Sequence, residues 1–101
     1  MDDFASSASL SYTGCSVTIP ENSIYAMLIE LVFMSSQPKE IAISYSDSSL
    51  TVYNTVFRSD ECSTASICGL TTFAATFHIW ARYDGAATNR LSIKGWHMPS
   101  E

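Results

Sequence analysis

Aromatic and basic residues gather near the end of the chain, with a spacing that suggests a binding surface. Both tryptophans and three of the five basic residues fall within Phe77–Met98. With a histidine between them, the candidates are Trp80, Trp96, Arg82, Arg90, Lys94 and His78. Indole rings bury a large apolar area and attract cations to their faces. These residue types predict binding to a partner or ligand, and they contain no nucleophile or acid–base pair.

The candidates fall on two apolar segments, Thr71–Tyr83 and Arg90–His97, which the sequence predicts to form a hairpin. The segments are separated by an Asp-Gly-led loop of hairpin length. If Tyr83 pairs with Asn89, one face of the hairpin is apolar, and it pairs Ala81 with Leu91, Ile79 with Ile93, and Phe77 with Gly95, which makes room for Phe77. The opposite face then pairs Arg82 with Arg90, Trp80 with Ser92, His78 with Lys94, and Thr76 with Trp96.

Three interpretations of this aromatic and basic face stay open. The second sheet of a sandwich covers the tryptophans, or a subunit interface buries them, since aromatic residues and Arg are enriched at interfaces. Alternatively, the face is an open platform on which sugar rings stack. The close group of three cations in an otherwise acidic protein favours the subunit interface.

Other residues offer little for catalysis or metal binding. In the predicted register His78 and His97 lie on opposite faces, so they cannot share a metal. The neighbouring carboxylates fall in terminal or loop segments, where solvation is their expected role; they are Asp2, Asp3, Asp60 and Glu61. The serines show no G-x-S-x-G elbow. We therefore expect neither an enzyme nor a cofactor.

The three cysteines cannot all pair within one chain. Cys62 and Cys68 have the spacing of a small loop disulfide, while Cys15 stands apart. A C-x5-C spacing without a second ligand pair is outside the usual zinc patterns. The chain opens Met1-Asp2-Asp3, without the features of a signal peptide. This predicts synthesis in a cytoplasm, or a trimmed sequence, and favours reduced thiols.

Length and composition predict one folded domain that does not bind nucleic acid. The chain has 101 residues, of which 47% are hydrophobic and only 15% are charged. We expect residues 1–101 to form one domain, with 1–7 as an N-terminal arm. The net charge of −5 disfavours nucleic acids and anionic membrane surfaces. A surface of hydroxyl groups in place of charges is common in extracellular and virion β-proteins.

Short alternating segments predict an all-β fold, a β-sandwich or jelly-roll-like domain of about seven antiparallel strands. The expected strands are residues 8–12, 15–20, 24–34, 41–45, 50–57, 71–83 and 90–97, with a polar loop at 58–69. The stretch Ile24–Met34 also fits a helix, but it is too short to span a bilayer. As a strand it is apolar on both faces, which fits a buried central strand or one whose outer face meets a neighbouring subunit.

Three stretches of the chain resemble the small C-terminal β-domains of bacteriophage tail-fibre and minor structural proteins. They are SVTIPENSIYAMLIEL, ISYSDSSLTVYN and FHIWARYDGAATNRLSIKGW. They match the strand entry S-x-x-IP-x-NSIY and two hairpin patterns of those domains, and the resemblance covers most of residues 15–97. The three cysteines and the ending His97–Glu101 depart from the family, so no binding residue carries over.

The resemblance implies a virion structural protein that trimerises at a fibre tip or decorates a capsid or baseplate. Its partners are then other copies of itself, other virion proteins and a host-surface glycan. The alternative from the residues themselves is a carbohydrate-binding module that uses the tryptophans and cations of the predicted hairpin.

Overall fold

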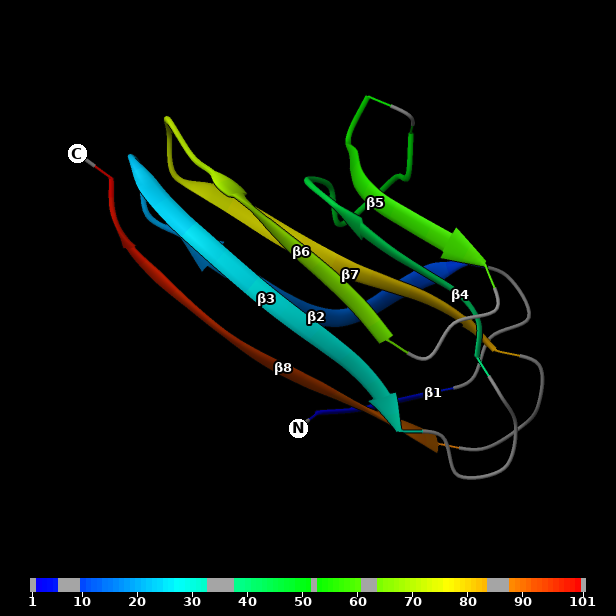
Figure 1. Cartoon of the computed structure of the whole chain (residues 1–101). Helices are drawn as coiled ribbons and strands as arrows, with labels where there is room; N and C mark the ends of the chain where they lie inside the picture. Colours follow the sequence, from blue (N-terminus) through cyan, green and yellow to red (C-terminus); the bar gives the residue numbers. More distant parts are fainter. Residues whose placement is uncertain are drawn as a thin grey trace.

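The computed structural model describes residues 2–5, 10–32, 38–51, 53–60, 64–83 and 88–100. These residues form eight strands, one more than expected (Figure 1): β1 (Asp2–Ala5), β2 (Ser11–Ile19), β3 (Ser23–Val32), β4 (Pro38–Ser44), β5 (Thr55–Asp60), β6 (Thr64–Leu70), β7 (Ala75–Tyr83) and β8 (Thr88–Pro99). The Cα atoms extend over 46 × 24 × 19 Å.

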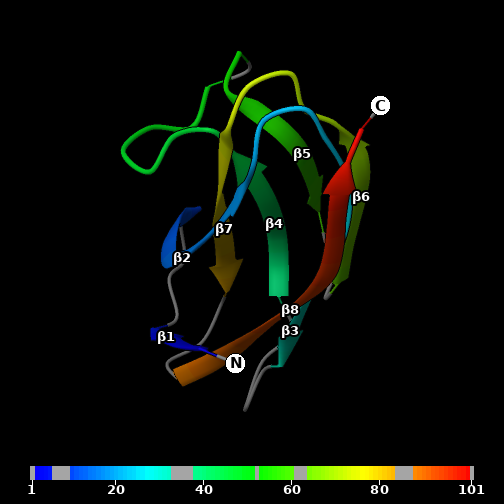
Figure 2. The same ribbon diagram turned by 90° about the vertical axis from the view of Figure 1, so that its left-hand side faces the viewer.

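The strands form two four-stranded antiparallel sheets. One sheet has the order β1-β8-β3-β6, and the other has the order β2-β7-β4-β5. We call them the β8 sheet and the β7 sheet. In Figure 2, β6 and the C-terminal part of β8 lie to the right of β7 and β4, in the other layer. Only the β4–β5 connection stays within one sheet, and every other connection crosses to the opposite one. Two four-stranded sheets connected in this way form a jelly roll, so the predicted fold class is confirmed.

The core lies between the two inner faces and is built by alternation along each strand. On β3, Tyr25, Met27, Ile29 and Leu31 are buried. The neighbouring strand β8 adds Leu91, and the facing sheet supplies the other large side chains of the core, which are Ile19, Ile41, Ile43, Phe77 and Ile79. Alternation with period two is what a strand requires and a helix forbids. The strand prediction for this segment is therefore confirmed, and the helical alternative is wrong.

Two predictions in the middle of the chain are wrong. Residues 50–57 do not form one strand, because the carbonyl of Thr51 accepts hydrogen bonds from the amides of Asn54 and Thr55, which closes a turn before β5. The predicted loop at 58–69 instead contains the end of β5 and all but the last residue of β6. Its small polar residues hide an alternation in which Ala65 and Ile67 face the core.

The predicted hairpin of the last two segments is also wrong. β7 lies between β2 and β4, while β8 lies between β1 and β3 in the other sheet. Phe77 pairs with Val17, and Gly95 pairs with Met27. A side chain at Gly95 would collide with the backbone carbonyl of Ala26, so this glycine makes room for β3 and not for Phe77. The apolar pattern identified the inward residues correctly, but it cannot specify which strands are neighbours.

Candidate interaction surface

The structure separates the six predicted site residues into two groups. Trp80, Arg82 and His78 lie on the outer face of the β7 sheet, and Trp96, Lys94 and Arg90 lie on the outer face of the β8 sheet. The sandwich core lies between the two groups. A single platform that combines both tryptophans with three cations is therefore not formed.

Trp80 is covered by its own chain. Only 8% of its surface is exposed, although it points away from the core. Its ring lies 6.0 Å from that of Tyr12, and its Nε1 donates a 2.9 Å hydrogen bond to the carbonyl of Ser46. Its cross-strand neighbour Ala42 is fully buried. The turn after β4 thus covers Trp80, a possibility outside the three interpretations of the sequence.

His78 shares this outer face with Trp80 and contacts the same tyrosine. Its Nδ1 lies 3.3 Å from the hydroxyl of Tyr12, and the two rings meet edge to face with centroids 5.3 Å apart. His97 lies in the other sheet and is exposed, so the two histidines are separated, though not by the predicted register. Among the described residues, no three potential metal ligands come together.

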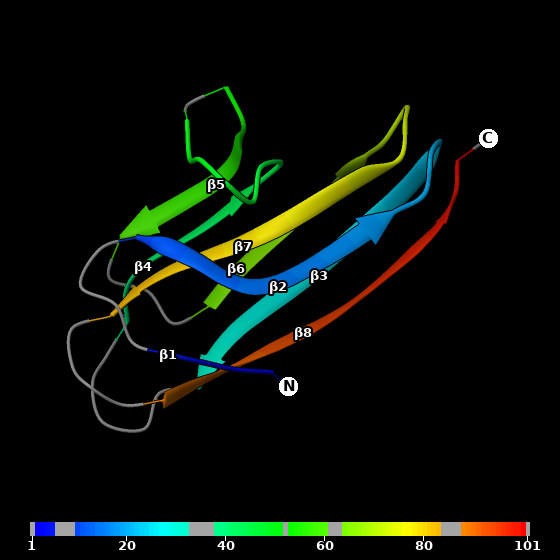
Figure 3. The ribbon, with the colours of Figure 1, turned by 180° about the vertical axis from the view of Figure 1, so that it is seen from behind.

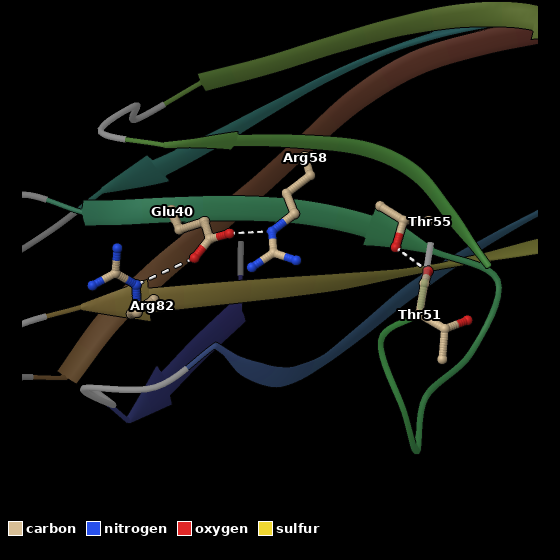
Figure 4. A network of polar contacts seen from close by, with 5 residues as sticks. All are labelled: Glu40, Thr51, Thr55, Arg58 and Arg82. Carbon is tan, nitrogen blue, oxygen red and sulfur yellow. Dashed lines mark hydrogen bonds and ion pairs between the residues drawn. The ribbon is translucent and has the colours of Figure 1, made fainter. Parts of the chain in front are cut away.

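Arg82 takes part in an ion-pair network around a buried carboxylate (Figure 4). Glu40 on β4 is 4% exposed and interacts with Arg82 on one side and Arg58 on the other. The Arg82 Nε lies 3.2 Å from Glu40 Oε1. Arg82 is the direct cross-strand partner of Glu40, while Arg58 reaches it diagonally. Arg82 therefore has an acidic partner. The predicted hairpin placed Arg82 opposite Arg90, and the structure does not.

The outer face of the β8 sheet carries the largest group of exposed apolar side chains in the described part of the chain. We call this group the outer apolar patch, and it consists of Ile24, Leu28, Leu70, Trp96 and Met98. The strand register places them side by side. Ile24 on β3 pairs with Leu70 on β6 and Met98 on β8, and Ala26 in the next row pairs with Trp96. Exposed apolar patches of this kind mark interaction sites.

A shallow depression of about 350 Å³ lies within this patch, beside Trp96. The side chains of Leu28, Ser66 and Lys94 line it with Trp96, whose surface is 53% exposed. Cys68, the neighbour of Ala26 on β6, has an exposed free thiol. The depression combines an aromatic ring, a cation and a hydroxyl, so it can bind by packing and hydrogen bonding.

Trp96 is the one residue of the outer apolar patch among the six candidates predicted from the sequence. Ile24, Leu28, Leu70 and Met98 were not proposed as site residues, although the sequence carried a signal for two of them. Residues 24–34 are apolar on both faces, and the structure buries one face in the core while exposing Ile24 and Leu28 on the other. Leu70 had no such signal because its strand was predicted to be a loop.

The remaining predicted features are placed as follows. Asp2 and Asp3 lie on β1, and Asp60 ends β5. Glu61 and Cys62 lie outside the described residues, and so does the Cys62–Cys68 disulfide that the cysteine spacing allowed as the alternative to reduced thiols. Cys15 is buried on β2.

Comparison with protein-family models and with curated proteins finds no match for this chain. No helix in the described residues is long and apolar enough to cross a membrane.

Proposed function

We propose that this protein is a non-enzymatic structural module of a virion, a fibre-tip, head-fibre or capsid-decoration domain that associates with copies of itself. The outer apolar patch on the β8 sheet carries the proposal. The jelly-roll topology supports it by analogy, because this fold recurs in viral capsid and lectin domains. The resemblance of its motifs to phage fibre domains points the same way, and a trimer is the oligomer that the resemblance implies.

The composition of the patch fits an interface better than a solvated surface. Interface centres are enriched in aromatic residues and Met and depleted in charge, with a polar rim. Trp96 and Met98 supply the aromatic ring and the Met of the patch on its β8 side, and Lys94 and Glu30 flank it along the strands. The same residues would be unfavourable as permanently hydrated surface, since apolar burial contributes about 25 cal/mol per Å².

Charge favours a second copy of the chain as the partner. Two molecules with a net charge of −5 repel one another over most approaches. On the outer apolar patch and its flanks, Glu30 is the one carboxylate among the described side chains, and Lys94 on the neighbouring strand offsets it. This face is therefore close to neutral, and two copies can meet there without that repulsion.

The size of the patch predicts reversible association. Three strands about 4.8 Å apart, paired from Ile24 to Glu30, span roughly 14 × 24 Å at a rise of about 3.4 Å per residue. This area of roughly 340 Å² is less than half of the 800 Å² or so per partner that is usual for a specific interface, so the contact belongs to the weak and transient class. We expect an oligomer that forms in the micromolar range and is strengthened by other virion contacts.

Truncation of Trp96 tests the proposal. Trp96→Ala should weaken self-association by about thirtyfold, equivalent to about 2 kcal/mol, because it removes the largest side chain of the patch. Light scattering coupled to size exclusion over a concentration series measures the effect. Tyr53→Ala is the matched control, since Tyr53 is 94% exposed in a turn outside the patch. A wild-type protein that is monomeric at high micromolar concentration contradicts the proposal.

A second set of measurements separates the virion role from sugar binding. Genes for tail or capsid proteins beside this gene support the virion role, and neighbours with unrelated metabolic functions contradict it. A glycan array addresses the carbohydrate-binding alternative. A glycan whose binding is lost in Trp96→Ala, from a protein that stays monomeric, would replace the proposal with a sugar site at the Trp96 depression.

A further inference from the structure

Strand β8 is only partly covered along one edge. β3 pairs with it from Arg90 to Pro99 on one side, but on the other side β1 pairs with it only from Thr88 to Leu91. Figure 3 shows β1 beside only the beginning of β8, with the rest of β8 forming the margin of the sheet. No strand of the described chain pairs with this margin from Ser92 to Pro99. Alternate backbone groups there point away from β3.

The core opens beside this uncovered margin. Leu91, which lies where β1 pairs with β8, is 2% exposed, whereas Ile93 on the same inner face is only partly buried. A cleft of about 270 Å³ begins here between the two sheets. Val17 and Ile19 of β2 line it from one side, and Met27, Ile93, Gly95 and His97 line it from the other. The sandwich is thus closed where β1 lies and open beyond it.

We propose that the margin of β8 from Ser92 to Pro99 accepts an extended strand of another polypeptide, one with an acidic residue opposite Lys94 and apolar residues at the alternate, inward-facing positions. Strand addition to a free sheet edge is an established mode of recognition, in which backbone hydrogen bonds give affinity and alternate side chains give specificity. Residues directly opposite one another in a sheet share a face. The apolar residues therefore enter the cleft beside Ile93 and Gly95, and the acidic residue meets Lys94 on the outer face.

Charge complementarity determines the acidic character of this strand. The segment Thr88–Pro99 contains two cations and a histidine but no carboxylate, in a chain with ten acidic and five basic residues. β1, which already pairs with β8, has the acidic and apolar sequence Asp-Asp-Phe-Ala, with Asp3 at the register position of Arg90. The added strand continues the line of β1, antiparallel to β8. A lysine at an exposed edge also discourages pairing with a second β8, where like charges would crowd together.

The proposal does not depend on self-association through the outer apolar patch, because strand addition uses the backbone groups of the edge. The probe is a synthetic capped octapeptide with Val or Phe at the inward positions, Asp at the outward position opposite Lys94 and Thr at the other outward positions. It is titrated into the isotopically labelled full chain, with amide hydrogen exchange followed by NMR. We expect saturable binding that slows exchange of the outward amides of Ser92–His97 by at least tenfold, with no slowing along β6, the opposite edge of the same sheet.

Two control peptides and one pair of variants make the test specific. The same peptide with every second amide N-methylated should not bind, and a version with Lys in place of Asp should bind at least fivefold more weakly. Lys94→Glu should weaken binding of the acidic peptide about three- to tenfold, and Lys94→Gln by less, because Lys94 is exposed and the protein retains its fold. No binding up to about 1 mM, equal binding of either control peptide, or protection on β6 would overturn the proposal.

Discussion

Trp80→Ala should lower the free energy of unfolding by about 3–5 kcal/mol and leave any self-association of the folded protein unchanged. Trp80 is buried between Tyr12, Ala42 and the turn at Ser46. Its removal opens a cavity over Ala42 and deletes the hydrogen bond that fastens the turn to the sheet. Urea denaturation followed by far-ultraviolet circular dichroism measures the loss. Release of the turn should also increase amide exchange at Ser46 and Ser48.

The second tryptophan provides the matched control. Trp96→Ala removes the same side chain from an exposed position, so its cost in folding stability should stay below about 1 kcal/mol. Trp80→Phe keeps most of the packing but loses the bond to Ser46, and it should cost about 1–2 kcal/mol. This variant keeps the prediction testable if Trp80→Ala does not fold. Equal stability losses for the two alanine variants would contradict the burial that the structure gives these residues.

The contrast between the two tryptophans shows what the sequence could not specify. Alternation assigns each residue to a face of its strand. The assignment was correct for β3, β7 and β8, because apolar residues at every second position are buried in the core. It does not say which strand lies beside which. The short Asp-Gly-led loop after Tyr83 favoured a hairpin, but in a jelly roll that connection crosses between the sheets. Packing of distant segments decided the outcome, and no local signal carried it.

Of the outer apolar patch, only the part on β3 could be predicted from the alternation within a single strand. The apolar outer face of residues 24–34 indicated a neighbouring surface, and Ile24 and Leu28 are indeed exposed there. Leu70 joins them because β6 pairs with β3, and this strand of small polar residues had no strong β signal. Trp80 was assigned to a binding face because alternation along its strand turns it away from the core. A turn covers it in the structure, and alternation cannot reveal such a cover. Side chains buried by turns carry no periodic pattern.

Glu40→Gln should destabilise the fold by about 3 kcal/mol, because it leaves two guanidinium groups beside a buried amide that cannot neutralise them. The cost is expected at the lower end for a buried ion pair, since the Arg58 side chain is more than half exposed and can turn to water. Arg82→Ala should cost more than Arg58→Ala, because Arg82 is the less exposed partner and lies directly across from Glu40. Chemical denaturation of the three variants gives the order.

Asp60→Asn is the control for charge alone. Asp60 is the exposed cross-strand neighbour of Glu40, so its neutralisation should change stability by less than about 0.5 kcal/mol. Replacing Glu40, Arg58 and Arg82 together by Leu should recover most of the stability lost in Glu40→Gln, since an apolar triad of similar volume removes the uncompensated charges. If Glu40→Gln behaves like Asp60→Asn, the network contributes no more than a surface ion pair. The buried position of Glu40 between two strands predicts the opposite.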